Sequence, residues 1–312
     1  MIKIFVVCHK PAYVVKNDLL IPVQVGAAAA KERIPGMEYD DNGDNISAKN
    51  PWYCELTAQY WAWKNVDADY YGFFHYRRYL TFGEVYPVDN AGNLEKKKRF
   101  QSYYEVDDIR EDLSKYCFDA ETMEKVILKY DFVTVLREKI NVTVYDQFIQ
   151  YHEKNAIDAV IRILKDSFPE YTSAADEYLN SKNIYYMNMF VMRREIFYEY
   201  SEWLFTILGE FENSREFKGL KMGQQRVMGY LAERLLGIFY VYKRRQGAVC
   251  AEVPYLKFYH TSFADTDSDT SNIRKFQLKP TKFEVNIDMR KFNKLFPAGS
   301  KRRLILRTIF LR

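Results

Sequence analysis

The chain has 312 residues, and 48% of them are hydrophobic, which is enough to bury a sizeable core in one large or two small domains. Its formal net charge of only +4 excludes a disordered acidic chain and gives no reason to expect a nucleic-acid binder. The four cysteines have no CxxC spacing, which indicates isolated thiols in a reducing compartment, and the four histidines include no HExxH motif.

Apolar runs typical of buried strands alternate with helical patterns along the chain. Strands are expected over residues 2–7, 70–74, 131–136, 184–192, 239–243 and 254–260. Helices are expected over residues 51–65, 119–130, 147–164, 195–212 and 223–237, whereas residues 83–117 are charged and indicate an irregular surface excursion. This alternation predicts an α/β fold with a mostly parallel central sheet flanked by helices. Residues 1–289 are expected to form one domain, followed by a basic helical tail over residues 290–312.

No membrane-spanning segment or signal peptide is expected. The first residues, MIKIFVV, form a short apolar run followed by charged residues, and no small-residue cleavage site appears. This pattern predicts a strand rather than a signal peptide. No stretch approaches the roughly 18 apolar residues that are needed to span a bilayer. We therefore expect a cytoplasmic protein, or one that is peripheral to a membrane.

The positive charge is concentrated at the end of the chain. Residues 290–312 carry eight basic residues and no acidic one, so the remaining chain has a net charge of −4. Bulky apolar residues are interleaved with these cations over residues 304–311. Such a tail suits an anionic membrane surface, which attracts each nearby cation by about 1 kcal/mol. The alternative is a basic helix that docks on the protein itself.

Basic residues follow the predicted strands at the points where ligands bind in open α/β sheets. They are His9 and Lys10 after the first strand, His75, Arg77 and Arg78 after the second, and Arg137 after the third. A guanidinium donates two parallel hydrogen bonds to phosphate oxygens, so the pattern favours an anionic ligand, most simply a diphosphate. The alternative is that Arg77 and Arg78 pair with surface carboxylates. Neither a Walker A loop nor a GxGxxG motif is present, which argues against ATP-hydrolysing and nicotinamide-dependent enzymes.

Acidic clusters give no firm metal site. Asp67 and Asp69 form a DxD, a pattern that can hold a divalent metal, but they precede the second strand and are predicted to form a turn at the opposite end of the sheet. Asp265, Asp267 and Asp269 follow His260, yet a run of this composition is typical of a solvated loop. We therefore assign no metal ligand, and Mn²⁺ or Mg²⁺ is disfavoured because no DxD follows the second strand.

Five blocks carry a resemblance to a known family. They are residues 45–65, 70–80, 145–152, 186–205 and 229–239, which are rich in Trp, Tyr and Asn. Over roughly residues 1–245 the chain resembles the bacterial capsular and exopolysaccharide biosynthesis family long catalogued as a domain of unknown function. Its members are regarded as GT-A-type glycosyltransferases, some of them galactofuranosyltransferases. The resemblance implies a GT-A-like fold, a UDP-sugar donor and a lipid-linked glycan acceptor.

The resemblance also implies a donor site. The first strand and His9 would lie beside the uracil and ribose. The loop and helix that would embrace the nucleoside carry Ser47, Lys49, Asn50, Glu55 and Thr57. The HYRRY block occupies the place where a GT-A enzyme usually carries its metal-binding DxD. The resemblance therefore implies that the arginines neutralise the leaving diphosphate without a metal. The alternative is that a metal ion is bound by residues elsewhere in the chain. The donor-binding residues expected on this basis are Val7, His9, Lys10, Lys49, Asn50, Glu55, Thr57, His75, Arg77 and Arg78.

An inverting transfer also needs a base for the acceptor hydroxyl. Asp146 is expected in the loop that enters the helix after the third strand, where acceptors usually lie, and Glu233 is the rival candidate. His152 follows Asp146 by six residues and is expected on the same helical face, unless it only caps the helix. Tyr145 and Asn188 are expected to contact the acceptor, although Asn188 would serve equally well to satisfy backbone groups at a strand end.

These expectations describe a glycosyltransferase of capsular or exopolysaccharide synthesis at the inner face of the cell membrane. Galactofuranose and galactose are the candidate sugars. One alternative is a nucleotidyl- or phosphotransferase on a similar sheet, which would want a carboxylate pair at the strand ends to hold magnesium. The other alternative is a non-catalytic module that binds a nucleotide or a glycan.

Overall fold

The computed structural model describes residues 1–94, 101–220 and 226–261, together with the backbone of residues 273–277 and 284–288. The last two segments, β14 (Ile273–Gln277) and β15 (Glu284–Asp288), pair antiparallel with each other. The basic tail over residues 290–312 and the acidic run at residues 265–269 lie outside the described residues. Within the part that is described, no helix is both long and apolar enough to cross a membrane.

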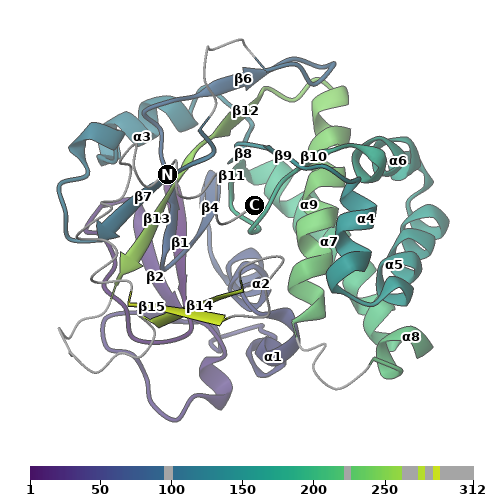
Figure 1. Cartoon of the computed structure of the whole chain (residues 1–312), viewed down its shortest axis with the longest axis horizontal. Coiled ribbons are helices and arrows are strands. Elements are labelled where there is room, and N and C mark those ends of the chain that lie inside the picture. Colours follow the sequence, from purple (N-terminus) through teal and green to yellow (C-terminus); the bar gives the residue numbers. More distant parts are fainter. Residues whose placement is uncertain (95–100, 221–225, 262–272, 278–283, 289–312) are drawn as a thin grey trace.

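Eleven strands form one sheet in the part of the chain that the structure describes (Figure 1). Its main path runs in the order β3 (Glu38–Tyr39), β2 (Leu20–Gln24), β1 (Ile2–Cys8), β4 (Tyr70–His75), β11 (Phe190–Arg193), β8 (Phe132–Val135), β12 (Cys250–Val253) and β6 (Tyr86–Val88). β11 and β6 run opposite to the other six strands of this path. The prediction of a mostly parallel central sheet is therefore confirmed.

A branch leaves this path at the end of β4. β5 (Arg78–Leu80) turns back from β4 and pairs antiparallel with β13 (Tyr255–His260), which pairs in parallel with β7 (Tyr103–Asp108). A separate short pair joins β9 (Glu138–Lys139) to β10 (Asn183–Ile184). The expectation of an irregular excursion over residues 83–117 is thus wrong, because this stretch supplies β6 and β7 to the sheet.

Helices flank the sheet. They are α1 (Asn50–Tyr53), α2 (Leu56–Asn65), α3 (Ala120–Ile127), α4 (Val144–Tyr151), α5 (Lys154–Ser167), α6 (Thr172–Asn180), α7 (Arg194–Asn213), α8 (Arg215–Lys218) and α9 (Val227–Arg245). Figure 1 shows α4, α5, α6 and α9 grouped on one side of the sheet and α3 on the other. α9 packs against α6, and α5 packs against α7.

The core is tightly packed where β1, β4 and β11 lie next to one another. Gly72 in β4 has no side chain, and a Cβ atom there would lie 2.9 Å from Ile4 Cγ1 and 3.0 Å from Val191 Cγ2. A residue larger than glycine would force these neighbours apart, since such carbon contacts are closer than van der Waals packing allows. The close approach of Ile4 and Val191 over β4 thus depends on this glycine.

Several predicted elements differ from the observed ones in ways that shape the site. The helix expected over residues 51–65 breaks at Cys54, whose φ of 52° is left-handed, into α1 and α2. The strand expected over residues 184–192 is interrupted by Met187 and Asn188, with φ values of 79° and 46°. The helix expected over residues 147–164 ends at Tyr151, and α5 begins three residues later.

The strand expected over residues 239–243 is instead the last part of α9. Phe239 and Tyr240 are fully buried in an aromatic cluster, where Phe239 lies 4.9 Å from Tyr200 and Tyr240 lies 5.0 Å from Phe132, measured between ring centroids. Basic residues in the last turn of α9 face the negative end of the helix dipole. Tertiary burial and charge at the helix end therefore override the β propensity of this aromatic run.

Candidate functional site

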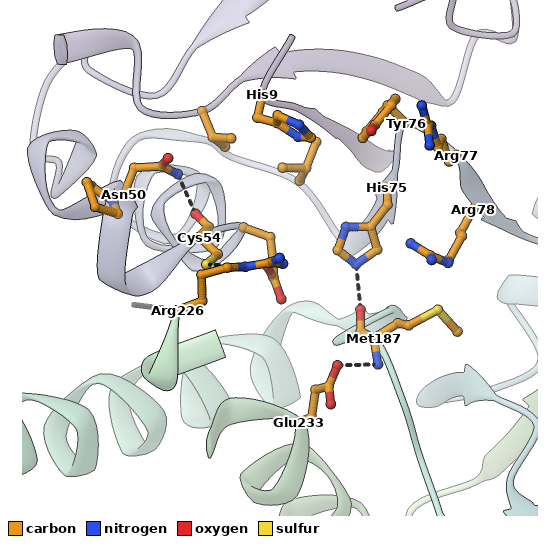
Figure 2. Close-up of a pocket in the computed structure, with 14 residues that line it drawn as sticks. His9, Asn50, Cys54, His75, Tyr76, Arg77, Arg78, Met187, Arg226 and Glu233 are labelled. Atoms are coloured by element: carbon orange, nitrogen blue, oxygen red, sulfur yellow. Dashed lines mark hydrogen bonds between the residues drawn. The ribbon is translucent and has the colours of Figure 1, made fainter. Parts of the chain in front are cut away.

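The carboxyl ends of β1 and β4 open onto a cavity of about 650 Å³. Figure 2 shows side chains from these strand ends, from α1 and from the beginning of α9 around this space. The predicted site residues that line it are Val7, His9, Asn50, Glu55, His75, Arg77, Arg78 and Glu233. Cys54, Met187 and Arg226 also line it, although the sequence did not identify them as site residues.

The strand register explains why the first two basic clusters meet. Val7 of β1 is the register partner of His75 of β4 in the parallel pair, and the N–H of Tyr76 donates to the carbonyl oxygen of Val7 at 3.1 Å. The chain then turns through Tyr76 and Arg77, and Arg78 pairs back with His75. His9 therefore lies next to this turn, with its ring 5.0 Å from the ring of Tyr76.

Arg77 and Arg78 keep their charge available at the cavity. No carboxylate of the described residues lies within ion-pairing distance of either guanidinium. The guanidinium of Arg77 lies 5.2 Å from the ring centroid of Tyr76, and its buried Nε has no hydrogen-bond partner in the described part of the chain. Among the described residues, the alternative that Arg77 and Arg78 pair with surface carboxylates is therefore wrong.

Arg226 adds a third cation from a distant part of the sequence. It has a left-handed φ of 77° and immediately precedes α9, and its Nε donates to Cys54 Sγ at 3.4 Å. Its guanidinium lies 5.7 Å from the ring centroid of Tyr230. A left-handed arginine has no local sequence signature, which is why the sequence did not reveal it.

Both histidines of the cavity favour the neutral form. Burial lowers the pKa of His9, and the positive charges of Lys10, Arg226 and Arg77 lower it further. Burial also lowers the pKa of His75, against the raising effect of the Glu55 carboxylate. The Nε2 of His75 lies 2.6 Å from the carbonyl oxygen of Met187. Because a carbonyl only accepts, this nitrogen carries the proton and donates.

Two carboxylates face the same cavity from different elements. Glu233 of α9 accepts from the N–H of Met187 at 2.9 Å and from Arg234 at 2.6 Å. Burial raises the pKa of Glu233, Arg234 lowers it, and the charge of Glu55 raises it. Glu55 lies between α1 and α2, and its Oε1 accepts from Asn188 Nδ2 at 2.7 Å. The cavity thus combines three arginines with two carboxylates.

Three predicted donor residues do not line the cavity. Lys10 is exposed, with Nζ 5.9 Å from the ring centroid of Tyr76. Lys49 forms an ion pair with Glu212 at 2.7 Å. Thr57 is fully buried and donates to the carbonyl oxygen of Cys54 at 3.1 Å. Thr57 thereby supports the break between α1 and α2 rather than facing the ligand space.

The residues predicted around the acceptor also lie off this cavity. Asp146 is exposed in the first turn of α4, where its carboxylate accepts from Thr143 Oγ1 at 2.7 Å, and Tyr145 donates to Asp158 at 2.7 Å. His152 follows the end of α4 with extended backbone and stacks on Tyr230 at 4.1 Å between ring centroids. His152 is thus the C-cap residue of α4, as the capping alternative expected, and it does not share a helical face with Asp146.

Asn188 is also placed differently from the expectation. It precedes β11 rather than following a strand, and it is only 3% exposed. Its Nδ2 donates to Glu55 and, at 3.0 Å, to the carbonyl oxygen of Gly229. Asn188 therefore joins α9 to the α1–α2 break beneath the cavity.

Two further basic or acidic groups have structural partners. Arg137 donates to the fully buried Glu252 and to the carbonyl oxygen of Gly92 at 2.9 Å, so it does not join the cations of the cavity. Asp67 pairs with Arg194 at 2.6 Å. Because β4 begins at Tyr70, the DxD at 67–69 precedes this strand, as expected. Among the described residues, no three His, Cys, Asp or Glu side chains gather as a metal-binding group.

Comparisons with known proteins agree with this arrangement of elements. A family model described as a domain of unknown function (DUF4422) matches residues 3–245. Among solved structures, the chain is similar to the WbbM bifunctional glycosyltransferase in its apo form, with 33% sequence identity and a TM-score of 0.74. The similarity covers 84% of this chain and 46% of that chain, so this chain spans about half the length of the solved protein. None of the curated proteins matches it. Because the family model matches most of the residues, the chain belongs to the DUF4422 family.

Proposed function

We propose that this chain is a GT-A-like glycosyltransferase that moves a sugar from a UDP-sugar to a glycan acceptor. The observation that carries the proposal is the convergence of Arg77, Arg78 and Arg226 on one cavity at the carboxyl ends of β1 and β4. The cavity volume of about 650 Å³ falls in the range typical of small-molecule sites, about 300–1,000 Å³. Similarity to a bifunctional glycosyltransferase supports glycosyl transfer over other uses of such a cavity.

Each side of the cavity suits one part of the donor. Val7, His9 and Asn50 lie on the side of β1 and α1 and would contact the nucleoside. The three guanidiniums would bind the diphosphate, since each offers parallel donors that match phosphate oxygens. During transfer, negative charge grows on the departing UDP, so fixed cations there stabilise the transition state more than the ground state.

The same arginines lead us to propose transfer without a required metal. In this family member the block that ends β4 and enters β5 reads HYRRYL, which would bring cations rather than acids to the diphosphate. Mn²⁺ or Mg²⁺ would then be dispensable, because the charge that it would neutralise is already matched by guanidiniums.

We further propose galactofuranose or galactose as the transferred sugar and a lipid-linked glycan of capsular or exopolysaccharide synthesis as the acceptor. The resemblance of residues 45–65, 70–80 and 229–239 to that family supports this choice. In this proposal residues 1–289 are the catalytic domain, and the basic tail over residues 290–312 holds it at the inner face of the membrane. Deleting residues 290–312 should reduce co-sedimentation with anionic vesicles, whereas equal sedimentation would refute the anchor.

A donor screen tests the proposed function. The full chain is incubated with UDP-galactopyranose, UDP-galactofuranose, UDP-glucose and their N-acetyl relatives, with and without a lipid-linked glycan acceptor. Release of UDP from one donor, accelerated by the acceptor, is the expected result. Binding of UDP without turnover of any donor would instead indicate a binding module.

A further inference from the structure

A left-handed turn beneath the cavity connects its two carboxylates and one of its histidines. Met187 and Asn188, with φ values of 79° and 46°, form this turn immediately before β11. The N–H of Met187 donates to Glu233 and its carbonyl oxygen accepts from His75, as the dashed lines of Figure 2 show. Non-glycine residues rarely adopt positive φ, so these contacts from three elements hold the turn in place.

The amide of Asn188 has only one orientation that satisfies its neighbours. Both groups that it faces, the carboxylate of Glu55 and the carbonyl oxygen of Gly229, are acceptors, so Nδ2 must point toward them. Its buried Oδ1 has no hydrogen-bond partner among the described residues. A buried oxygen without a hydrogen bond destabilises the fold, so the amide orientation that holds Glu55 is kept at the expense of Oδ1.

Glu55 and Glu233 differ in how far their oxygens are occupied. In Glu233 one oxygen accepts from Met187 and the other from Arg234, which also balances its charge. In Glu55 only Oε1 accepts a hydrogen bond, and neither a donor to Oε2 nor a cation within 4.0 Å is found among the described residues. Glu55 thus keeps a free carboxylate oxygen at the cavity, whereas Glu233 is committed to holding the turn.

We propose that Glu55 is the general base of an inverting transfer and that Asn188 is its positioning residue. This inference rests on the proposed function. Oε2 of Glu55 takes the proton of the acceptor hydroxyl while the hydroxyl oxygen forms a bond to C1 of the donor sugar. The bond from C1 to the β-phosphate oxygen breaks, and its electron pair leaves on UDP beside the three arginines. Glu55 then returns the proton to water.

Substitutions at the two carboxylates provide the first test. Glu55→Gln should lower kcat about 10²–10⁴-fold, the range expected for loss of a general base, with UDP affinity by calorimetry unchanged. Glu55→Asp keeps the carboxylate and should retain more activity than Glu55→Gln. Glu233→Gln keeps an oxygen for Met187 and should lose less activity than Glu55→Gln. Glu121→Gln, an exposed residue on α3, is the matched control and should behave as wild type.

Asn188→Gly tests the positioning role, because glycine adopts a left-handed φ without strain but lacks the amide. It should lower kcat with little change in KM in the wild-type background, yet cause no further loss in Glu55→Gln, since it acts through Glu55. Equal losses in both backgrounds would overturn the positioning role.

Wild-type turnover in Glu55→Gln would overturn the base assignment, as would a larger loss in Glu233→Gln at an unchanged unfolding temperature. A wild-type chain that releases no UDP from any donor refutes the proposed function itself.

Discussion

Val7 and His75 are register partners at the carboxyl ends of two parallel strands, β1 and β4. Because the two strands run parallel and end in register, the residues that follow each strand share one edge of the sheet. On that edge lie His9, which follows β1, and the arginine pair that follows β4. The proposed donor site is thus built on rigid strands, which hold cations in place before a ligand arrives.

Arg226 should contribute to nucleotide affinity although it lies far from the arginine pair in sequence. Arg226→Ala is expected to weaken UDP binding about tenfold or more, because one charge-assisted hydrogen bond contributes about 1.5–3 kcal/mol. Calorimetry with UDP measures the change. Lys49→Ala, which removes a cation paired with Glu212 outside the cavity, is the control and should bind UDP as wild type does. Equal losses in both variants would argue against direct contact by Arg226.

Chelation should leave transfer largely intact, because in our proposal guanidiniums neutralise the diphosphate. The rate of UDP release by the full chain is compared before and after treatment with excess EDTA. The expected result is an unchanged rate, and added Mn²⁺ should give no large gain. Complete loss with EDTA that Mn²⁺ restores would show that a divalent ion takes part.

His152 should make the fold sensitive to acid. Burial, reinforced by the charge of Arg234, lowers the pKa of His152 to about 4. In the unfolded chain this histidine binds a proton near pH 6.5, whereas the folded chain keeps it neutral, so the free energy of unfolding falls as pH decreases from about 6.5 toward 4.

His152→Phe keeps a ring to stack on Tyr230 but cannot titrate. Urea unfolding at pH 7.5 and pH 5 should show that wild type loses about 1–2 kcal/mol more stability than this variant, since each pKa unit corresponds to about 1.4 kcal/mol. Identical losses in the two proteins would mean that His152 does not become protonated on unfolding.

The sequence predicts the part of the site that lies at the strand ends. Continuous apolar runs mark β1 and β4, and the residues that follow parallel strands meet at one edge of a sheet, so His9, Arg77 and Arg78 could be grouped before the structure was known. No apolar run or predicted strand end marks Arg226 or Met187 in the sequence. Both have positive φ and reach the cavity only through the packing of α9 and β11.

Breaks in helices were the other source of error. The apolar spacing of Leu56, Tyr60 and Trp63 continues back through Tyr53, which hides the left-handed break at Cys54 that presents Glu55 to the cavity. Likewise no glycine or proline marks the end of α4 before His152. The spacing of apolar residues along a helix indicates which side chains become buried. It does not reveal where tertiary contacts break the helix and reorient the chain.

Binding of UDP to a chain that lacks Arg77 and Arg78 tests the central claim most directly. Arg77→Ala and Arg78→Ala are combined, and UDP affinity is measured by calorimetry against wild type and against Arg162→Ala, an exposed arginine on α5 that pairs with Glu216. The account predicts a loss of about 10²-fold or more in the double variant, from two charge-assisted contacts of about 1.5–3 kcal/mol each, and none in the control. UDP affinity equal to that of wild type in the double variant would contradict it.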